Sequence, residues 1–158
     1  MCRTCRLAAI ADDFTGGADL AGMLHENGAR TGQVFGLQPD EFFRTLSGRY
    51  EAAVLSLKSR SVPAADACRM SVDALDRLEL LSPAQFQFKY CSTFDSTPEG
   101  NIGPVTARLM ERLGVEFTVA VPALPVNGRT QYLGHLFVGS QLLSESHLRY
   151  HPVTPMTD

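Results

Sequence analysis

Short segments with the pattern of β-strands recur along most of the chain. They occupy residues 7–11, 31–37, 52–57, 86–91 and 117–121. Residues 7–11 and 52–57 are continuous apolar runs, which are typical of strands that are buried on both faces of a parallel sheet. We predict a strand at each of the five positions, with polar loops that begin at Asp12, Lys58, Ser92 and after Pro122.

Apolar residues at helical spacing lie between several of these runs. Leu20, Met23 and Leu24 form such a stripe after the first run, and Gly28 is the expected C-cap. Two further stripes complete the pattern: Ala67, Met70, Ala74, Leu75 and Leu78 after Pro63, and Ile102, Val105, Leu109 and Leu113. Strands alternating with helices predict an α/β fold, in which helices flank a mainly parallel sheet through right-handed crossovers.

The alternation stops after Pro122. The segment Val126-Asn127-Gly128-Arg129 contains an Asn-Gly pair, which commonly closes a two-residue hairpin. Residues 132–138 are the expected returning strand, and residues 139–158 show little periodicity. We predict a hairpin-like segment near the carboxyl end, and we expect the chain to stop before its protein does.

The composition fits one folded domain over residues 1–158. Apolar residues make up 44% of the chain and charged residues 20%, a balance that excludes a disordered protein. The net charge of −3 and the lack of any lysine or arginine run argue against nucleic acid as a partner. No apolar run approaches the length of a membrane span, so we expect no membrane partner.

The cysteines and histidines do not predict a metal site. The four cysteines are scattered and lack the density of a secreted disulfide scaffold, so we interpret them as reduced thiols of a cytoplasmic protein. Cys2 and Cys5 have the spacing of metal ligands, but no second pair follows. The histidines are isolated along the chain; they are His25, His135, His147 and His151.

Two aspartates follow the first predicted strand, directly before the glycines that open a helix. Asp12 and Asp13 can accept hydrogen bonds from sugar hydroxyls, or take a proton from a hydroxyl that attacks an electrophile. Sites in α/β folds lie at this edge of the sheet, so both residues are catalytic candidates. The alternative is that one Asp, or Thr15, caps the helix.

Cations and hydroxyls follow the third and fourth predicted strands. In Lys58-Ser59-Arg60-Ser61, Arg60 can hold a carboxylate by two parallel hydrogen bonds, which suits an acidic substrate; the alternative is a solvated turn whose serine caps the next helix. Lys89 can neutralise an acid group, and a polar loop that ends at a helix amino terminus follows it. Within that loop we predict as substrate-binding residues Asp95, Ser96, Thr97 and Asn101, with a hydrophilic capped loop as the alternative.

Arg129, beside the Asn-Gly pair, is a further substrate-binding candidate, although Asn-Gly by itself predicts only a turn. Known nucleotide motifs are missing from the sequence. Neither Gly-x-x-x-x-Gly-Lys-Ser/Thr nor a Gly-x-Gly-x-x-Gly after the first strand occurs. We therefore expect neither a cofactor nor a metal on this chain.

Three segments, residues 10–16, 89–103 and 121–139, together resemble the four-carbon acid sugar kinase family. The Cys-Ser-Thr-Phe, Asp-Ser-Thr and Pro-Glu-Gly-Asn sequences within the second segment, and the closing residues 151–158, are most similar to the 3-oxo-tetronate kinase branch. Gly17 stands where many members of the family have alanine, a difference that we expect to matter little.

The resemblance implies an amino-terminal α/β domain that holds the acid sugar and a separate carboxyl-terminal domain that holds ATP and Mg²⁺. This chain covers the first, so the nucleotide-binding domain is missing or lies on a split partner chain, and the chain alone is expected to be inactive. By the resemblance, Asp12 or Asp13, Arg60 and the Asp95-Ser96-Thr97 loop grip the substrate. The cations meet its carboxylate and the aspartates its hydroxyls. A non-catalytic sugar-acid-binding module and a threonate or erythronate kinase fragment are the alternatives.

Overall fold

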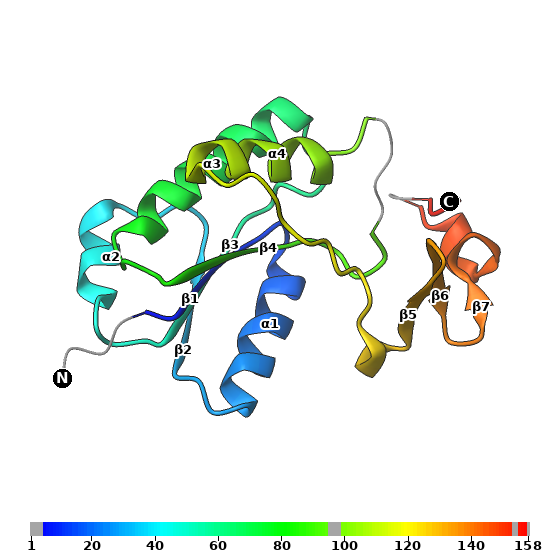
Figure 1. The fold of residues 1–158 in the computed structure, drawn as a ribbon, viewed down its shortest axis with the longest axis horizontal. Helices are drawn as coiled ribbons and strands as arrows, with labels where there is room; N and C mark the ends of the chain where they lie inside the picture. The colour runs from blue at the N-terminus through cyan, green and yellow to red at the C-terminus, as the bar shows by residue number, and fades with distance from the viewer. Residues whose placement is uncertain (1–4, 95–98, 153–154, 158) are drawn as a thin grey trace.

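The computed structural model describes residues 5–94, 99–152 and 155–157 (Figure 1). Its larger part is a sheet of four parallel strands in the order β2-β3-β1-β4. The strands are β1 (Leu7–Ala11), β2 (Thr31–Phe35), β3 (Ala52–Ser56) and β4 (Gln85–Lys89). The predicted mainly parallel sheet is thereby confirmed, with strand ends shifted by up to two residues.

Helices cover both faces of this sheet. Their bounds are α1 (Phe14–Glu26), α2 (Asp40–Leu46), α3 (Ala64–Glu79) and α4 (Ile102–Leu113). Leu20, Ala21 and Leu24 of α1 pack on one face, whereas the apolar sides of α2, α3 and α4 share a core cluster on the other. The central strands β1 and β3 are almost entirely buried because both of their faces are covered.

Helix α2 was not predicted from the sequence. It is seven residues long, so its apolar pattern is too short to show a helical period. Phe43 is nevertheless fully buried in the core and fixes the helix against the sheet. Tertiary packing, rather than local pattern, therefore decides this element.

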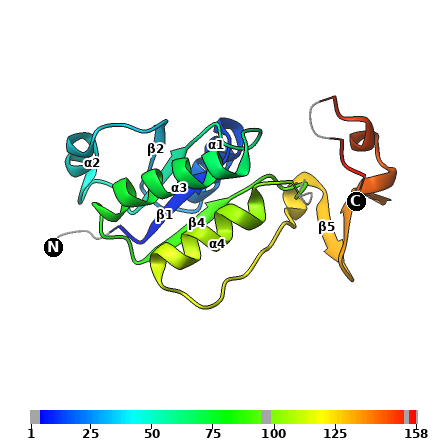
Figure 2. The same ribbon diagram turned by 90° about the horizontal axis from the view of Figure 1, so that it is seen from above.

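A second, smaller sheet follows α4. It is antiparallel, in the order β5-β6-β7, and consists of β5 (Arg129–Tyr132), β6 (His135–Val138) and β7 (Gln141–Leu142). Short 3-10 turns flank it: η1 (Pro125–Asn127), η2 (Leu143–Glu145) and η3 (His147–Tyr150). Figures 1 and 2 show this sheet set apart from the parallel sheet, on the side toward which β4 runs.

The strand predicted at residues 117–121 is wrong. The segment has no strand partner among the described residues, and its apolar side chains are exposed: 83% for Phe117, 78% for Val119 and 67% for Val121. An apolar run favours burial, but a strand also needs a hydrogen-bonded neighbour. Phe117 and Thr118 instead line a cavity beside β4. Among the described strands, β4 is therefore an edge of the sheet.

The predicted hairpin turn is also in the wrong place. Asn127 ends η1, and Gly128, with φ +68°, helps to close a loop whose ends pair through Leu124 and Arg129. The hairpin turn lies at Leu133-Gly134, where φ is +48° and +83°. Positive φ at both central positions is typical of a type I′ turn, which favours Asn-Gly. Because Leu133 stands where asparagine is preferred, the sequence does not show this turn.

Candidate functional site

The carboxyl ends of β1, β3 and β4 meet at one edge of the parallel sheet, and the backbone of Asp12 joins them. The Asp12 amide donates to the Lys89 carbonyl at 3.1 Å, and the Asp12 carbonyl accepts from the amides of Ser59 at 2.9 Å and Arg60 at 3.2 Å. Asp12 is only 3% exposed. The main chain thus fixes the three loops relative to one another.

Asp13 links α1 to the loop after β3. Its carboxylate caps α1 by accepting a hydrogen bond from the Gly16 amide, and it pairs with Arg60 Nη1 at 3.4 Å. The capping role proposed as an alternative for these aspartates therefore holds for Asp13. The same carboxylate also orients a cation toward the sheet edge, because Arg60 approaches its second oxygen.

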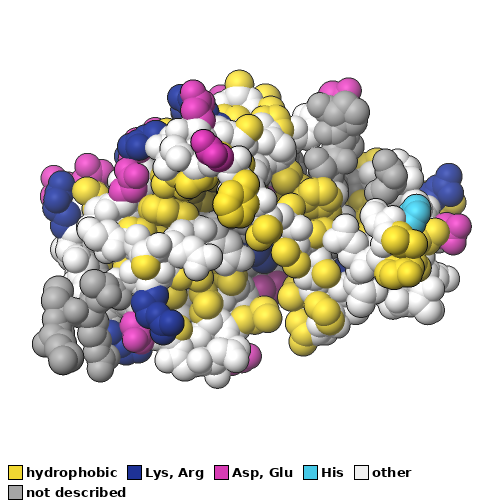
Figure 3. Space-filling model, in the orientation of Figure 1, with side chains coloured by type: hydrophobic (Ala, Val, Ile, Leu, Met, Phe, Trp, Pro, Cys, Tyr) yellow, Lys and Arg dark blue, Asp and Glu magenta, His cyan; other side chains and the backbone are white. Residues whose placement is uncertain are grey.

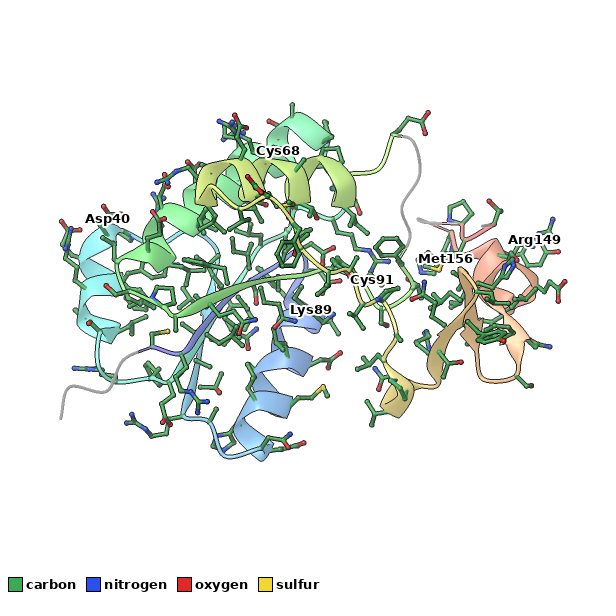
Figure 4. All side chains as sticks on the ribbon, viewed as in Figure 1. Asp40, Cys68, Lys89, Cys91, Arg149 and Met156 are labelled. Carbon is green, nitrogen blue, oxygen red and sulfur yellow. The ribbon has the colours of Figure 1, made fainter. Side chains whose placement is uncertain are left out.

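Lys89 brings a second cation to the amino terminus of α1. Its Nζ donates to the Tyr90 carbonyl at 2.8 Å, and a β-carbon on Gly16 would lie 3.4 Å from that nitrogen and 3.0 Å from Asp13 Oδ1. Figure 4 shows Lys89 over this end of the helix. Lys89 and Asp13 thus border a position without a side chain at the amino terminus of α1, and Arg60 reaches the same carboxylate of Asp13. Cations at a helix amino terminus favour an anion.

Asn101 connects the amino terminus of α4 to the loop after β3. It is 7% exposed, and its Nδ2 lies within hydrogen-bonding distance of the carbonyls of Ser59 at 2.6 Å, Arg60 at 3.1 Å and Val62 at 3.5 Å. The side chain therefore holds the backbone that carries Arg60. The prediction of Asn101 as a substrate-binding residue rests on the polar loop that it ends, whereas these contacts, 39 to 42 residues apart in sequence, could not be predicted from the sequence.

Among the remaining predicted site residues, the structure describes Arg129. Arg129 lies on β5, and its Nη1 donates to the Asn127 carbonyl at 2.8 Å; among the described residues, no hydrogen bond or ion pair joins it to Asp13, Arg60 or Lys89. The predicted contacts of three more residues lie outside the described part of the chain: Asp95, Ser96 and Thr97. Lys58 lies over the Phe14 ring, with Nζ 5.0 Å from its centroid.

The loop after β4 is held by aromatic and polar contacts. The Tyr90 ring packs edge-on against Phe88 and Phe94, with centroids 5.8 and 5.2 Å apart. Burial raises the pKa of Tyr90, and a hydrogen bond with the Val121 backbone opposes that shift. Thr93 is buried, with its hydroxyl 2.9 Å from Cys91 Sγ. The loop thus leaves the sheet in a fixed direction.

A close contact between α1 and β3 was missed by the sequence analysis. A β-carbon on Gly17 would lie 2.0 Å from Ser56 Oγ, and that hydroxyl accepts from Gln33 Nε2 at 2.9 Å. The expectation that alanine here matters little is therefore wrong for this chain, since Ser56 occupies the space. Glycine lets α1 approach the sheet and brings its amino terminus to the site.

The described cysteines Cys5, Cys68 and Cys91 carry free thiols, and burial raises the pKa of Cys5. Within residues 5–94, 99–152 and 155–157, no group of three or more His, Cys, Asp or Glu side chains could hold a metal ion. The helices of the same ranges include none long and apolar enough to cross a membrane.

Comparison with known proteins gives consistent matches along the chain. A family model described as "Sugar-binding N-terminal domain" matches residues 7–158. The chain is 58% identical to a 3-oxo-tetronate kinase from Brucella melitensis and 52% identical to one from Escherichia coli, over 97% of its length in each case. It covers 34% and 38% of these relatives, so it spans about a third of their length.

Solved structures give the same correspondence. A Salmonella typhimurium protein described as a putative tRNA synthase is 51% identical, with a TM-score of 0.88 over 98% of this chain and 36% of that one. A domain of unknown function from Bordetella bronchiseptica, solved as a domain-swapped dimer with bound citrate, is 29% identical. Its TM-score is 0.75 over 96% of this chain and 37% of that one.

Proposed function

This chain belongs to the sugar-binding N-terminal domain family, and on that premise we propose that it is the acid-sugar-binding part of an ATP-dependent kinase. The substrate of the whole protein is 3-oxo-tetronate, and phosphorylation of its terminal hydroxyl gives the 4-phosphate. Two curated 3-oxo-tetronate kinases at 52% and 58% identity support this assignment.

The observation that carries the proposal is the group of Asp13, Arg60 and Lys89 at one edge of the sheet, where Asp13 pairs with Arg60 and Lys89 lies near Gly16. A four-carbon acid sugar offers one carboxylate and several hydroxyls. Arg60 and Lys89, together with the amino terminus of α1, match the carboxylate, and aspartate oxygens match the hydroxyls. Bound citrate in the Bordetella bronchiseptica neighbour, a carboxylic acid with a hydroxyl, agrees with this chemical class.

The residues have distinct roles in this proposal. Arg60 and Lys89 orient the acid end, and Asp12 or Asp13 accepts the proton of the terminal hydroxyl as it attacks phosphorus. Since Asp13 already caps α1 and pairs with Arg60, it also keeps the cation in place. The loop of Asp95, Ser96 and Thr97 contacts the sugar hydroxyls, and Arg129 approaches the substrate from the small sheet.

ATP and Mg²⁺ belong to the polypeptide that the relatives carry outside the matched third. The described residues offer no metal-binding group of three or more His, Cys, Asp or Glu. When bound, ATP and Mg²⁺ supply the phosphoryl group and neutralise its charge. The chain alone binds and orients the sugar without transferring phosphate.

We also propose a cytoplasmic location, which fits the free thiols of the described cysteines.

Calorimetric titration of the purified chain with 3-oxo-tetronate, threonate and erythronate tests the proposal. We expect 3-oxo-tetronate to bind most tightly, and Arg60→Ala to weaken binding about 10- to 100-fold, the usual effect of losing hydrogen bonds to a charged group. Arg69→Ala is the matched control, because Arg69 is an exposed arginine on α3.

Each titration outcome separates the alternatives. Equal affinity of the wild type and Arg60→Ala would contradict the assigned site, and absence of binding by a folded chain would contradict an autonomous substrate domain. Preference for threonate or erythronate would point to another kinase of the family. Phosphorylation of bound sugar by the chain co-expressed with the remainder of the Brucella melitensis relative, with ATP and Mg²⁺, would distinguish a kinase part from a non-catalytic binding module.

A further inference from the structure

Strand β4 presents an open edge of the parallel sheet. Among the described strands it pairs with β1 alone. Because the Lys89 carbonyl accepts from the Asp12 amide, the backbone of Lys89 faces β1. Backbone groups alternate in direction along an extended strand, so those of Phe86 and Phe88 face away from β1.

An apolar cavity of about 420 Å³ lies beside this edge. Phe86 and Phe88 of β4 line one side, Leu109 and Leu113 of α4 another, and Phe117 contributes from the chain that follows α4. Well-packed domains have few voids of this size, and one at a sheet edge is shaped to take side chains from a neighbouring element. The cavity therefore has room, beside the edge of β4, for apolar side chains of a neighbouring segment.

The edge lacks the features that usually protect an exposed strand. Its sequence, Gln85-Phe86-Gln87-Phe88-Lys89, contains neither proline nor a charge before its last residue. Exposed Phe117, Val119 and Val121 extend the apolar surface next to it. Figure 3 shows hydrophobic side chains gathered on the face over which the chain leaves α4 toward the small sheet.

We propose that the open edge of β4 receives a β-strand from the polypeptide that the relatives carry beyond the matched third. A row of outward backbone groups is satisfied by another backbone, and the cavity accepts every second side chain of an extended segment. The added strand is assigned to that polypeptide because this chain spans only 34% to 38% of the length of these kinases. This inference rests on the proposed function in taking the chain as one part of a longer kinase.

Hydrogen–deuterium exchange at single-amide resolution tests the added strand. The probe is the remainder of the Brucella melitensis relative, co-expressed with this chain and purified as a complex. We expect the amides of Phe86 and Phe88 to exchange at least about tenfold more slowly in the complex than in the chain alone. The Gln87 amide, which faces β1, is the internal control and should change little.

Substitutions at the same edge separate backbone pairing from side-chain packing. Phe86→Pro removes an outward N–H without touching the ladder to β1, and should weaken the complex at least about tenfold. Phe86→Leu keeps the N–H and should weaken it much less. Circular dichroism of both variants is the control that checks whether the free chain is still folded.

Several results would overturn the added strand. These are a complex without slower exchange at Phe86 and Phe88, equal losses in the proline and leucine variants, or no complex at all. Protection that appears in the chain alone and grows with its concentration would assign the edge to a second copy instead. Acid-sugar titration of the same samples distinguishes failure of this proposal from failure of the proposed function. Sugar binding without slower exchange in β4 would contradict only the added strand. Slower exchange without sugar binding would contradict only the proposed function.

Discussion

The helix-covered sheet of residues 7–113 and the segment of residues 114–157 use their apolar residues in opposite ways. In the first region, Phe43 and Leu55 have no exposed surface, and both faces of the central strands are covered. In the second, Phe117 is 83% and Leu133 80% exposed. Although Leu143 and Met156 are buried, the second region thus leaves large apolar side chains on surface that is open to further contacts.

The sharpest way to break this comparison is to truncate one phenylalanine in each region. Phe43→Ala empties a fully buried site and should lower the free energy of unfolding by about 3–5 kcal/mol. Phe117→Ala removes an exposed ring and should change it by less than about 0.5 kcal/mol. Urea denaturation measures both, and a large loss for Phe117→Ala would show that the second region is packed in solution.

A second test concerns two glycines of the same helix. Gly17→Ala places a methyl group against Ser56 and should cost about 1–3 kcal/mol of stability. Gly22→Ala meets nothing within 4 Å and should stabilise α1 by up to about 1 kcal/mol. Thermal or chemical denaturation measures the stability of both variants. Equal changes in the free energy of unfolding would contradict the tight contact between α1 and β3.

Asn101→Ala tests how the site loop is held. Its amide nitrogen serves buried backbone carbonyls, so we expect a loss of about 1–3 kcal/mol in the free energy of unfolding. Weaker acid-sugar binding should accompany this loss, because Arg60 sits on the loop. Asn27→Ala is the matched control, since the same atom of Asn27 makes an exposed bond to the Met23 carbonyl. A loss no larger than that of the control would argue against this positioning role.

The smallest effect is expected in the small sheet. Leu133→Asn converts the type I′ turn to its preferred Asn-Gly sequence, and the leucine is 80% exposed, so little packing is lost. We expect slower amide exchange in β5 and β6, with a gain of a few tenths of a kcal/mol up to about 1 kcal/mol. Faster exchange would mean that Leu133 has a contact in solution that outweighs the turn preference.

Local pattern predicted the parallel sheet well because its central strands β1 and β3 are short, apolar and followed by polar turns. It also brought Asp13, Arg60 and Lys89 to one edge, since the carboxyl ends of parallel strands meet there. It failed where the decisive partner is distant in sequence. Asn101 holds a loop 39 to 42 residues earlier, and Gly17 is fitted to a hydroxyl on another strand.

The run at residues 117–121 failed for a different reason. Its composition is that of a strand, but composition does not name a hydrogen-bonding partner, and none of the described strands pairs with it. The Asn-Gly pair likewise turns the chain, but within a loop that follows a 3-10 turn. In both cases the sequence favours a local conformation, but the surrounding structure decides whether a strand or a hairpin forms there.

The main-chain junction at Asp12 has a consequence for how this protein can diversify. The loops after β1 and β3 are registered by the Asp12 carbonyl and the amides of Ser59 and Arg60, groups that every residue except proline provides. The side chain at position 60 is therefore replaceable without dismantling the loop that presents it. On the proposed function, selectivity for the acid can therefore change by single substitutions at position 60 while the backbone of the loop stays the same.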